Sequence, residues 1–334
     1  MKILVAQPGK IGDLVCTTPL FRTLAENFKA PVDIIAGPFA LDLLKGNDSV
    51  REVYSRKVEP DILRKENYTH ILVLMPSVEI WGLARKASIS NIWSTIHPKM
   101  TRRERLFSFF YLTRKFPYNF SSAQQHYLQM GQALGAANLI QKREIRYGSE
   151  DEQKIAEFLR EQNLQDKKLV GISVTAGKDF KEWGNQNYKQ LVDKLNSENF
   201  TVIAVGTKEE RPKLETLQNS LARQDMFLNV AGDFKLSEFA ALAVNFRAFI
   251  AADTGPLYIA DALGIPVVDL MGPCYSGGQK PLGENAVLIG ECLKPEHPKC
   301  RMMDSPNYLK EEFQRCMAEI RFEEVWQGFQ SLKL

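Results

Sequence analysis

The chain has 334 residues, of which 44% are hydrophobic and 25% charged, a composition that excludes a disordered or fibrous protein. Its length suits two α/β domains of ordinary size. The net charge is only +3, which excludes a general attraction to nucleic acid, so any basic binding site must be local.

The N-terminus begins with a short apolar run that ends at Gln7, Pro8 and Gly9. A secretory signal needs an apolar core of about 7–15 residues, so this run predicts a buried first strand instead. No segment reaches the roughly 18 apolar residues of a membrane helix. Five cysteines without a signal peptide favour a reducing compartment. We therefore expect a cytoplasmic protein that touches a membrane only peripherally.

Short apolar runs alternate with helical patterns along the first half of the chain. The runs predict strands at Ile3–Ala6, Val32–Ala36 and Ile71–Met75, and the helical patterns lie at Leu14–Phe28 and Phe39–Lys45. The stretch 101–120 is rich in arginine and aromatic residues and has no clean period. We predict a helix followed by an active-site loop there.

A second series begins after Tyr147, where Ser149 is a suitable N-cap for a helix with acidic residues in its first turn. Strands are predicted at Leu169–Ser173, Thr201–Val205, Phe249–Ala252 and Val267–Leu270. Helices are predicted at Asn187–Asn196, Glu209–Leu221, Leu236–Val244 and Gly255–Leu263, with an amphipathic helix at 322–332. This alternation is typical of parallel sheets with crossover helices, so we predict two consecutive doubly wound α/β domains, residues 1–148 and 149–334.

Open parallel sheets bind ligands at the carboxyl ends of their strands, so the strand-to-helix junctions are the candidate sites. At the first junction, Gly9 and Gly12 let the backbone turn tightly and approach a ligand. Asp13 follows at the start of a helix. An aspartate there most often caps the helix, but a carboxylate at this edge can also act as a general base.

Two junctions in the second half carry charged side chains. The loop 173–183 contains Lys178 and Lys181 and can bind phosphate through backbone N–H groups and a lysine charge, with an ordinary solvated loop as an equal alternative. The loop lacks the Gly-Lys-Ser/Thr ending of a Walker A motif. At the next junction, Glu209 or Glu210 can hydrogen-bond a ribose, or simply favour the start of a helix.

A further junction reads Asp253-Thr254-Gly255-Pro256 between a strand and a helix. Asp253 or Thr254 can cap the helix, and Pro256 suits its first position. A helix N-terminus carries roughly +0.5 of an elementary charge, which suits a pyrophosphate. A well-capped structural helix explains the same pattern.

The segment 99–115 is basic, with one acid, Glu104, against Lys99, Arg102, Arg103, Arg105, Arg114 and Lys115. Aromatic residues are interleaved with these charges. A surface that meets an anionic amphiphile is favoured over a merely solvated helix face. The alternative is that the arginines only solvate a helix while the aromatic side chains fill the domain core.

Patterns for metal binding and nucleophilic catalysis are weak. The four histidines have no zinc spacing, and Cys292, Cys300 and Cys316 match no common zinc ribbon. The cysteines are better explained as buried thiols. No serine-hydrolase elbow is present. We therefore predict no metal site.

Several segments resemble the bacterial glycosyltransferase family 9, best known for the lipopolysaccharide heptosyltransferases. The family's first motif is similar to IGDLVCTTPLFRTL, its central Lys-x-Trp segment to TAGKDFKEWGNQNYKQL, and its long nucleotide-binding signature to AADTGPLYIADALGIPVVDLMGP. The tail, with its three cysteines before an amphipathic helix, is also similar. The chain departs from the family at Tyr258, where histidine is usual, and at Gly184, where proline is common.

The resemblance implies a GT-B architecture, in which two doubly wound Rossmann-like domains face a central cleft, and an inverting transfer that needs no metal or other cofactor. Domain 1–148 would bind the acceptor and supply Asp13 as the catalytic base. Domain 149–334 would bind the nucleotide sugar, with its phosphates at Lys181 and its ribose at Glu209 or Glu210. The expected donor-binding residues are Gly12, Thr175, Lys181, Glu209, Glu210, Asp253, Thr254, Gly255 and Pro256.

Under this resemblance the default donor is ADP-heptose and the default acceptor a lipopolysaccharide-core or related glycolipid. Arg102, Arg103 and Arg105 would bind the anionic acceptor. We expect a monomer that contacts the cytoplasmic face of the inner membrane and binds no nucleic acid.

Three other functions stay open: a sugar-nucleotide epimerase of GT-B-like fold, a heptosyltransferase that modifies a protein, and a non-catalytic nucleotide-sugar binder. Asp13 in its motif argues against a pure binder. The need for an acceptor separates a transferase from an epimerase.

Overall fold

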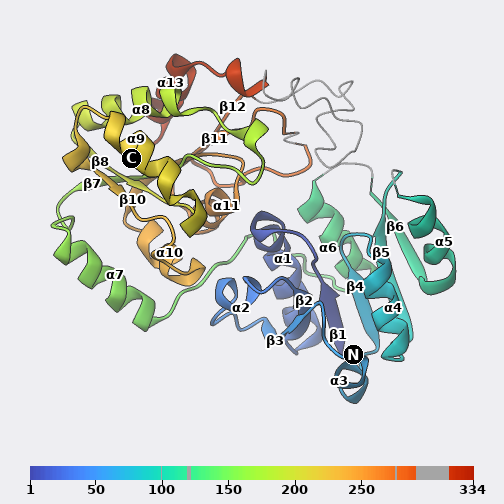
Figure 1. Cartoon of the computed structure of the whole chain (residues 1–334). Coiled ribbons are helices and arrows are strands. Elements are labelled where there is room, and N and C mark those ends of the chain that lie inside the picture. The colour runs from blue at the N-terminus through green and yellow to red at the C-terminus, as the bar shows by residue number, and fades with distance from the viewer. Residues whose placement is uncertain (99, 119–121, 275–276, 291–315) are drawn as a thin grey trace. The chain divides into compact units, whose positions relative to one another are not determined.

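A computed structural model describes residues 1–98, 100–118, 122–274, 277–290 and 316–334 (Figure 1). The chain divides into two compact units, Met1–Ile145 and Arg146–Leu334. Each unit is one parallel six-stranded sheet with helices on its faces. No helix within the described ranges is long and apolar enough to cross a membrane.

The sheet of the first unit has the strand order β3-β2-β1-β4-β5-β6, which is that of a doubly wound fold. Its strands are β1 (Ile3–Ala6), β2 (Val32–Ala36), β3 (Val50–Ser55), β4 (His70–Val73), β5 (Asn91–Ile96) and β6 (Arg114–Pro117). Its helices are α1 (Ile11–Phe28), α2 (Ala40–Leu43), α3 (Pro60–Lys65), α4 (Val78–Lys86), α5 (Arg102–Tyr111) and α6 (Ala123–Ala133). Every residue of β1 and β2 is buried, because helices cover both faces of such a sheet.

The sheet of the second unit repeats this winding, with the order β12-β11-β10-β7-β8-β9. Its strands are β7 (Lys168–Ser173), β8 (Phe200–Ala204), β9 (Phe227–Asn229), β10 (Phe246–Ala252), β11 (Val267–Leu270) and β12 (Ala286–Ile289). Its α-helices are α7 (Ser149–Glu161), α8 (Asn185–Ser197), α9 (Arg211–Ser220), α10 (Leu236–Ala243), α11 (Gly255–Ala262) and α13 (Phe322–Ser331). Short 3-10 helices lie at η1 (Asp179–Lys181), η2 (Lys208–Glu210) and η3 (Gln224–Met226).

In both units the strand order switches direction between the first and fourth strands, which pair in parallel: at β1/β4 and at β7/β10. Loops that leave these two strands on opposite faces open a crevice at their carboxyl ends, where doubly wound folds bind ligands. Asp13 lies in the first turn of α1, just after β1, Lys181 lies in η1 after β7, and Asp253 follows β10 directly. The winding therefore brings the predicted junctions to the place where a ligand is expected.

Two local predictions are wrong. Within the stretch predicted as a helix and a loop, residues 102–111 form α5 and residues 114–117 form an edge strand, β6. Ser149 is the first helical residue of α7 and not its cap; Gly148 is the N-cap, and its N–H donates to Asp151 Oδ2 at 2.8 Å. The carboxylate of Asp151 thus takes over the capping that a serine hydroxyl was expected to provide.

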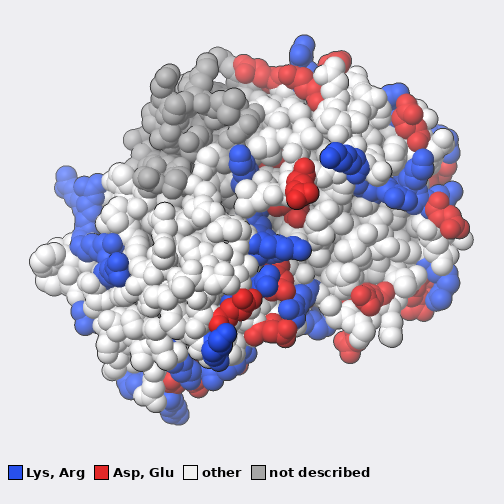
Figure 2. All heavy atoms as spheres, turned by 180° about the vertical axis from the view of Figure 1, so that it is seen from behind, with Lys and Arg blue, Asp and Glu red and all other residues white. Residues whose placement is uncertain are grey.

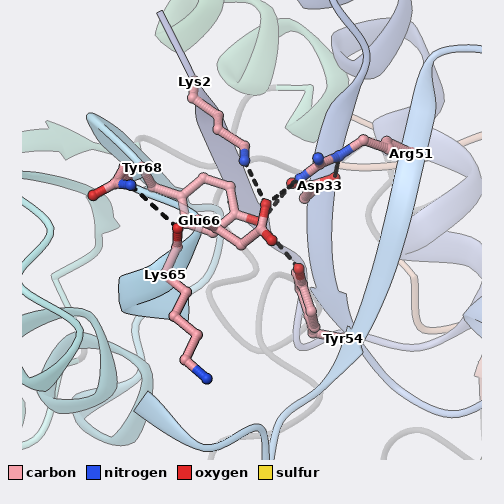
Figure 3. A network of polar contacts seen from close by, with 8 residues as sticks. Lys2, Asp33, Arg51, Tyr54, Lys65, Glu66 and Tyr68 are labelled. Carbon is pink, nitrogen blue, oxygen red and sulfur yellow. Dashed lines mark hydrogen bonds and ion pairs between the residues drawn. The ribbon is translucent and has the colours of Figure 1, made fainter. Parts of the chain in front are cut away.

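A polar network ties the amino ends of β1, β2 and β3 together (Figure 3). The carboxylate of Asp33, which is 2% exposed, accepts from Arg51 Nε at 2.9 Å and from the Tyr68 hydroxyl at 2.5 Å. Glu66 accepts from Arg51 at 2.6 Å and from Lys2. The hydrogen bonds from Lys2 and Arg51 lower the pKa of Glu66 to about 2. Because this network lies at the edge of the sheet opposite the ligand crevice, we interpret it as structural.

Candidate active site

Asp13 is the third residue of α1, and its side chain folds back over the loop that precedes the helix. Its Oδ2 accepts the backbone N–H of Lys10, the N-cap, at 2.7 Å. Gly9 makes room for this contact, since a Cβ on Gly9 would lie 2.4 Å from Asp13 Oδ2. Asp13 therefore does cap its helix, from the third position, and the same bond holds the half-buried carboxylate at the ligand edge of the sheet. Capping and a role as a base are compatible.

Gln7, the first residue after β1, organises this turn from beneath. Its side chain is buried, with Oε1 accepting the Gly9 N–H at 3.1 Å and Nε2 donating to Thr17 Oγ1 at 2.9 Å. Thr17 in turn donates to the backbone oxygen of Asp13 at 2.7 Å. Gln7 and Thr17 were not among the site residues predicted from the sequence. An amide directly after a buried strand, ten residues before a threonine on the next helix, is the signal that could have found them.

In the second unit, Lys181 is bound by Asp253. The lysine Nζ donates to Asp253 Oδ2 and to the backbone oxygen of Asp253, each at 2.6 Å. Lys181 is 8% exposed, and burial by itself would lower its pKa; the neighbouring Cys274 and Asp253 outweigh burial and raise the pKa above its ordinary value. The lysine is therefore charged, and its position is set by the loop after β10.

The loop that carries Lys181 is anchored by Trp183. The indole N–H of Trp183 donates to the Ile320 backbone oxygen at 2.8 Å, and its ring packs edge-on against Tyr188. Gly184 then has φ +94°, a left-handed conformation that proline cannot adopt. The departure from the family at Gly184 thus changes how the chain leaves the tryptophan, while the tryptophan itself remains buried.

Asp253 also accepts hydrogen bonds from Tyr258 and Cys274. The Tyr258 hydroxyl lies 2.5 Å from Asp253 Oδ1, and Cys274 Sγ lies 2.9 Å from Asp253 Oδ2. Burial alone would raise the pKa of Asp253, but the charge of Lys181 and these hydrogen bonds hold it below its ordinary value. Tyr258, which stands where the family has histidine, therefore has a defined contact: it donates to the carboxylate that holds Lys181.

Asp269 on β11 is a second buried carboxyl beside this group. It is fully buried, and within the described part of the chain neither of its carboxyl oxygens has a hydrogen-bond partner. Burial and the negative charge of Asp253 raise its pKa well above the ordinary value. Asp269 was not among the site residues predicted from the sequence, because it lies inside an apolar strand. A carboxyl at such a position is itself an unusual feature.

The N-terminus of α11 adjoins Asp253. Thr254 is the N-cap, and Pro256 is the second helical residue rather than the first, because the helix begins at Gly255. Thr254 Oγ1 is buried and has no hydrogen-bond partner among the described residues. Its hydroxyl makes no cap bond. The first turn therefore presents backbone N–H groups and an unsatisfied hydroxyl, a combination that suits a phosphate oxygen.

The remaining predicted donor residues lie on neighbouring loops of their units. Thr175 is buried directly after β7, and Gly12 is buried in the first turn of α1. Glu210 Oε2 accepts the Thr207 N–H at 2.6 Å, so this side chain caps η2, whereas Glu209 is exposed. Gly12 lies in the first unit beside Asp13, apart in sequence from every other expected donor residue.

The three expected acceptor residues, Arg102, Arg103 and Arg105, lie together on α5 and are all exposed. Arg105 donates to the Pro98 backbone oxygen at 2.7 Å. Lys99, Cys292 and Cys300 lie outside the described residues, and Cys316 is partly buried. Among the residues that the structure describes, no group of three or more His, Cys, Asp or Glu side chains is arranged to hold a metal ion.

Comparisons with known proteins match most of the chain to one family. The sequence model of glycosyltransferase family 9 (heptosyltransferase) matches residues 63–309. Lipooligosaccharide heptosyltransferase 2 of Haemophilus ducreyi is 23% identical over 317 residues, covering 86% of this chain and 88% of that protein.

Two solved structures show the fold. A family 9 glycosyl transferase from Veillonella parvula superposes with a TM-score of 0.80 at 18% identity, covering 99% of this chain and 96% of that one. The ADP-heptose lps heptosyltransferase II of E. coli superposes with a TM-score of 0.78 at 20% identity, covering 99% and 98%. The predicted GT-B architecture is thereby confirmed.

Proposed function

Because the chain belongs to glycosyltransferase family 9, we propose that it transfers heptose from ADP-heptose to a lipopolysaccharide-core or related glycolipid acceptor, with inversion at the anomeric carbon and without an obligatory metal. The observation that carries the proposal is the group around Asp253 at the switch point of the second sheet, where a buried, charged lysine lies beside the N-terminus of α11. The names of the H. ducreyi and E. coli relatives support heptose as the sugar.

The donor diphosphate is proposed to bind between Lys181 and the first turn of α11. An ammonium group has three donors, and two of those of Lys181 go to Asp253. The third can point to a phosphate oxygen, while Thr254 Oγ1 and the N–H of Gly255 can donate to its neighbours. Thr175 and Pro256, which lie in the same unit, would shape this site. Tyr258 acts indirectly, by orienting Asp253.

The donor ribose is proposed to bind at Glu209. Of the two glutamates after β8, Glu210 already caps η2 through the Thr207 N–H. The side chain of Glu209 is exposed, and hydrogen bonds from its own N–H and from Thr207 lower its pKa, so it is ionised at neutral pH. An ionised carboxylate can accept both ribose hydroxyls, as acidic residues after a second strand do in other doubly wound folds.

In the proposed reaction Asp13 removes the proton of an acceptor hydroxyl, and the oxygen attacks the anomeric carbon from the face opposite the nucleotide. The bond from that carbon to the diphosphate oxygen breaks, and negative charge develops on the departing nucleoside diphosphate. The charge of Lys181 and the N-terminal dipole of α11 stabilise it, as a divalent cation does elsewhere. The first unit would thus carry the base and acceptor and the second the donor.

The acceptor is proposed to bind through Arg102, Arg103 and Arg105. Guanidinium groups match the phosphates and carboxylates of a bacterial core glycolipid, because each can donate two parallel hydrogen bonds. All three side chains are exposed on one short helix of the unit that contains Asp13.

The deciding experiment measures donor binding and turnover separately. Calorimetry with ADP, UDP, GDP and CMP should show the tightest binding for ADP, and ADP-heptose should be consumed only when a core glycolipid is added, with EDTA present. Lys181→Ala should weaken ADP binding, and Lys194→Ala, which removes a partly exposed lysine of α8 that pairs with Glu198, is the control for the loss of a positive charge. Conversion of the sugar nucleotide without an acceptor would instead indicate an epimerase, and transfer to a protein alone would contradict the glycolipid acceptor.

A further inference from the structure

The surface formed by α5 and the edge strand β6 exposes large apolar side chains. Phe109 is 75% exposed, Phe110 60% and Leu106 58%, all within ten residues of helix. Leu106 and Phe109 follow Arg102 at helical spacing, so they share one face. Few exposed apolar side chains on a soluble domain lie this close together unless the surface meets a partner or a membrane.

The aromatic residues of this segment divide into two sets. Phe107, Tyr111 and Leu112 pack against the core formed by β1, β4, β5 and α4, and Ser108 is buried. They hold α5 against the domain. The alternative that the aromatic side chains fill the core is therefore correct for Phe107 and Tyr111, but not for Phe109 and Phe110, which point away from it.

The same surface is strongly basic. The exposed cations are Arg102, Arg103, Arg105, Arg114 and Lys115. The acid of α5, Glu104, turns back to accept the Thr101 N–H at 2.7 Å. Figure 2 shows basic side chains gathered at the left edge, where α5 and β6 lie, with uncharged atoms around them. Lys115 lies over the Phe109 ring at 5.9 Å, so the charged and apolar groups are intermixed.

We infer that this basic aromatic surface (α5 and β6, residues 102–117) docks the protein onto an anionic lipid bilayer, with Leu106, Phe109 and Phe110 entering the boundary between headgroups and acyl chains. An amphipathic helix that presents aromatic and leucine side chains among arginines is suited to lie in that boundary. The arginines and Lys115 then reach lipid phosphates, and each basic residue near such a surface strengthens binding. A protein partner would have to be both acidic and apolar on the same small patch, whereas a bilayer of acidic phospholipids is so by composition.

This inference does not depend on which sugar is transferred, and its test needs neither donor nor acceptor. The purified full chain is sedimented with anionic vesicles of phosphatidylethanolamine and phosphatidylglycerol in a ratio of about 3:1. A second sample is sedimented with vesicles of phosphatidylcholine. We expect binding to the anionic vesicles, and weaker binding in 1 M salt, where the screening length falls to about 3 Å. Equal binding to both vesicle types would contradict the inference.

Two variants test the residues. Phe109→Ser with Phe110→Ser should lower vesicle binding about tenfold or more, from the loss of buried aromatic surface. Arg102→Gln, Arg103→Gln and Arg105→Gln together should lower it about a hundredfold at low salt, at about fivefold per charge. Because these side chains are exposed, the variants should unfold at the wild-type temperature.

The matched controls carry the same changes elsewhere. Leu41→Ser with Ile62→Ser removes two exposed apolar side chains of the first unit, 62% and 47% exposed. Arg160→Gln, Arg223→Gln and Arg247→Gln remove three exposed charges of the second. Both controls should bind vesicles like the wild type. The inference is overturned if the controls lose as much binding as the test variants, or if sedimentation without lipid shows a dimer that Phe109→Ser with Phe110→Ser abolishes.

Discussion

Lys181 and Asp253 are 72 residues apart in sequence, yet the lysine Nζ lies 2.6 Å from both the carboxylate Oδ2 and the backbone oxygen of Asp253. The two residues follow β7 and β10, the adjacent strands between which the winding of the second sheet reverses. A lysine held in this way is pre-organised for a phosphate, because its position does not depend on the ligand.

Lys181→Met removes the charge and keeps much of the volume of the side chain. We expect ADP binding to weaken by about 1.5–3 kcal/mol, the usual contribution of a hydrogen bond to a charged group. Calorimetry of the variant against Lys194→Ala measures this loss. Unchanged affinity in a folded Lys181→Met protein would mean that the diphosphate binds elsewhere.

Thr254→Val should change stability and binding in opposite directions. The buried hydroxyl has no partner in the described ranges, so an isosteric valine should raise the free energy of unfolding of the unliganded protein by about 1 kcal/mol. ADP affinity should fall by a similar amount if the hydroxyl donates to phosphate. Thermal unfolding with and without ADP gives both values. A loss of stability without ligand would show that the hydroxyl has a structural partner.

Asp13→Asn separates helix capping by Asp13 from its proposed role as the base. Asparagine keeps an oxygen that can accept the Lys10 N–H, so the start of α1 should remain capped. It cannot accept a proton, and kcat should fall about 10²–10⁴-fold while the KM for the donor changes little. Wild-type turnover by this variant would exclude Asp13 as the base. Asp13→Ala, which removes both functions, should also unfold at a lower temperature.

Asp269→Asn tests the buried carboxyl through the pH dependence of stability. Since the folded-state pKa of Asp269 is raised, the folded chain keeps a proton that the unfolded chain loses above about pH 4. The contribution of Asp269 to the free energy of unfolding is therefore most favourable below that pH. It is lost at about 1.4 kcal/mol per pH unit as the pH rises toward the folded-state pKa. Between about pH 5 and pH 8 the free energy of unfolding of the variant should therefore exceed that of the wild type. The unfolding free energies of variant and wild type are measured by urea denaturation at each pH. If the two change with pH in parallel, Asp269 is not neutral in the folded chain.

His126 should make the first unit sensitive to acid. Burial lowers its pKa to about 4, and its Nε2 lies 3.0 Å from Thr95 Oγ1. Because the pKa of His126 is lower in the folded chain, its contribution to the free energy of unfolding is complete above the unfolded-state pKa of about 6.5. This contribution is lost as the pH falls toward the folded-state pKa. His126→Gln should flatten the fall in unfolding free energy between these values. If the unfolding free energy of the variant decreases at acid pH as steeply as that of the wild type, other groups cause the decrease.

The sequence by itself determined the elements whose signal is local. Strands β1, β2 and β11 lie where the apolar runs predict them, because a strand buried on both faces is mostly apolar; Asp33 in β2 and Asp269 in β11 are the exceptions. The glycines, prolines and charged residues after these runs located the loops at the ligand edge. The expected residues at the strand-to-helix junctions therefore lie at the carboxyl edges of the sheets, since the carboxyl end of a parallel strand follows directly from its boundaries.

Only the tertiary structure decided which of these residues contact one another and which side chains are exposed. Asp253 holds Lys181, and Tyr258 donates to Asp253, through packing between segments far apart in sequence. The edge strand β6 and the division between the partly buried Phe107 and the exposed Phe109 could not be predicted from the sequence, because half-exposed segments lack the continuous apolar pattern of a core strand. Sequence periodicity reports burial along one element; pairing across elements depends on how the sheets wind.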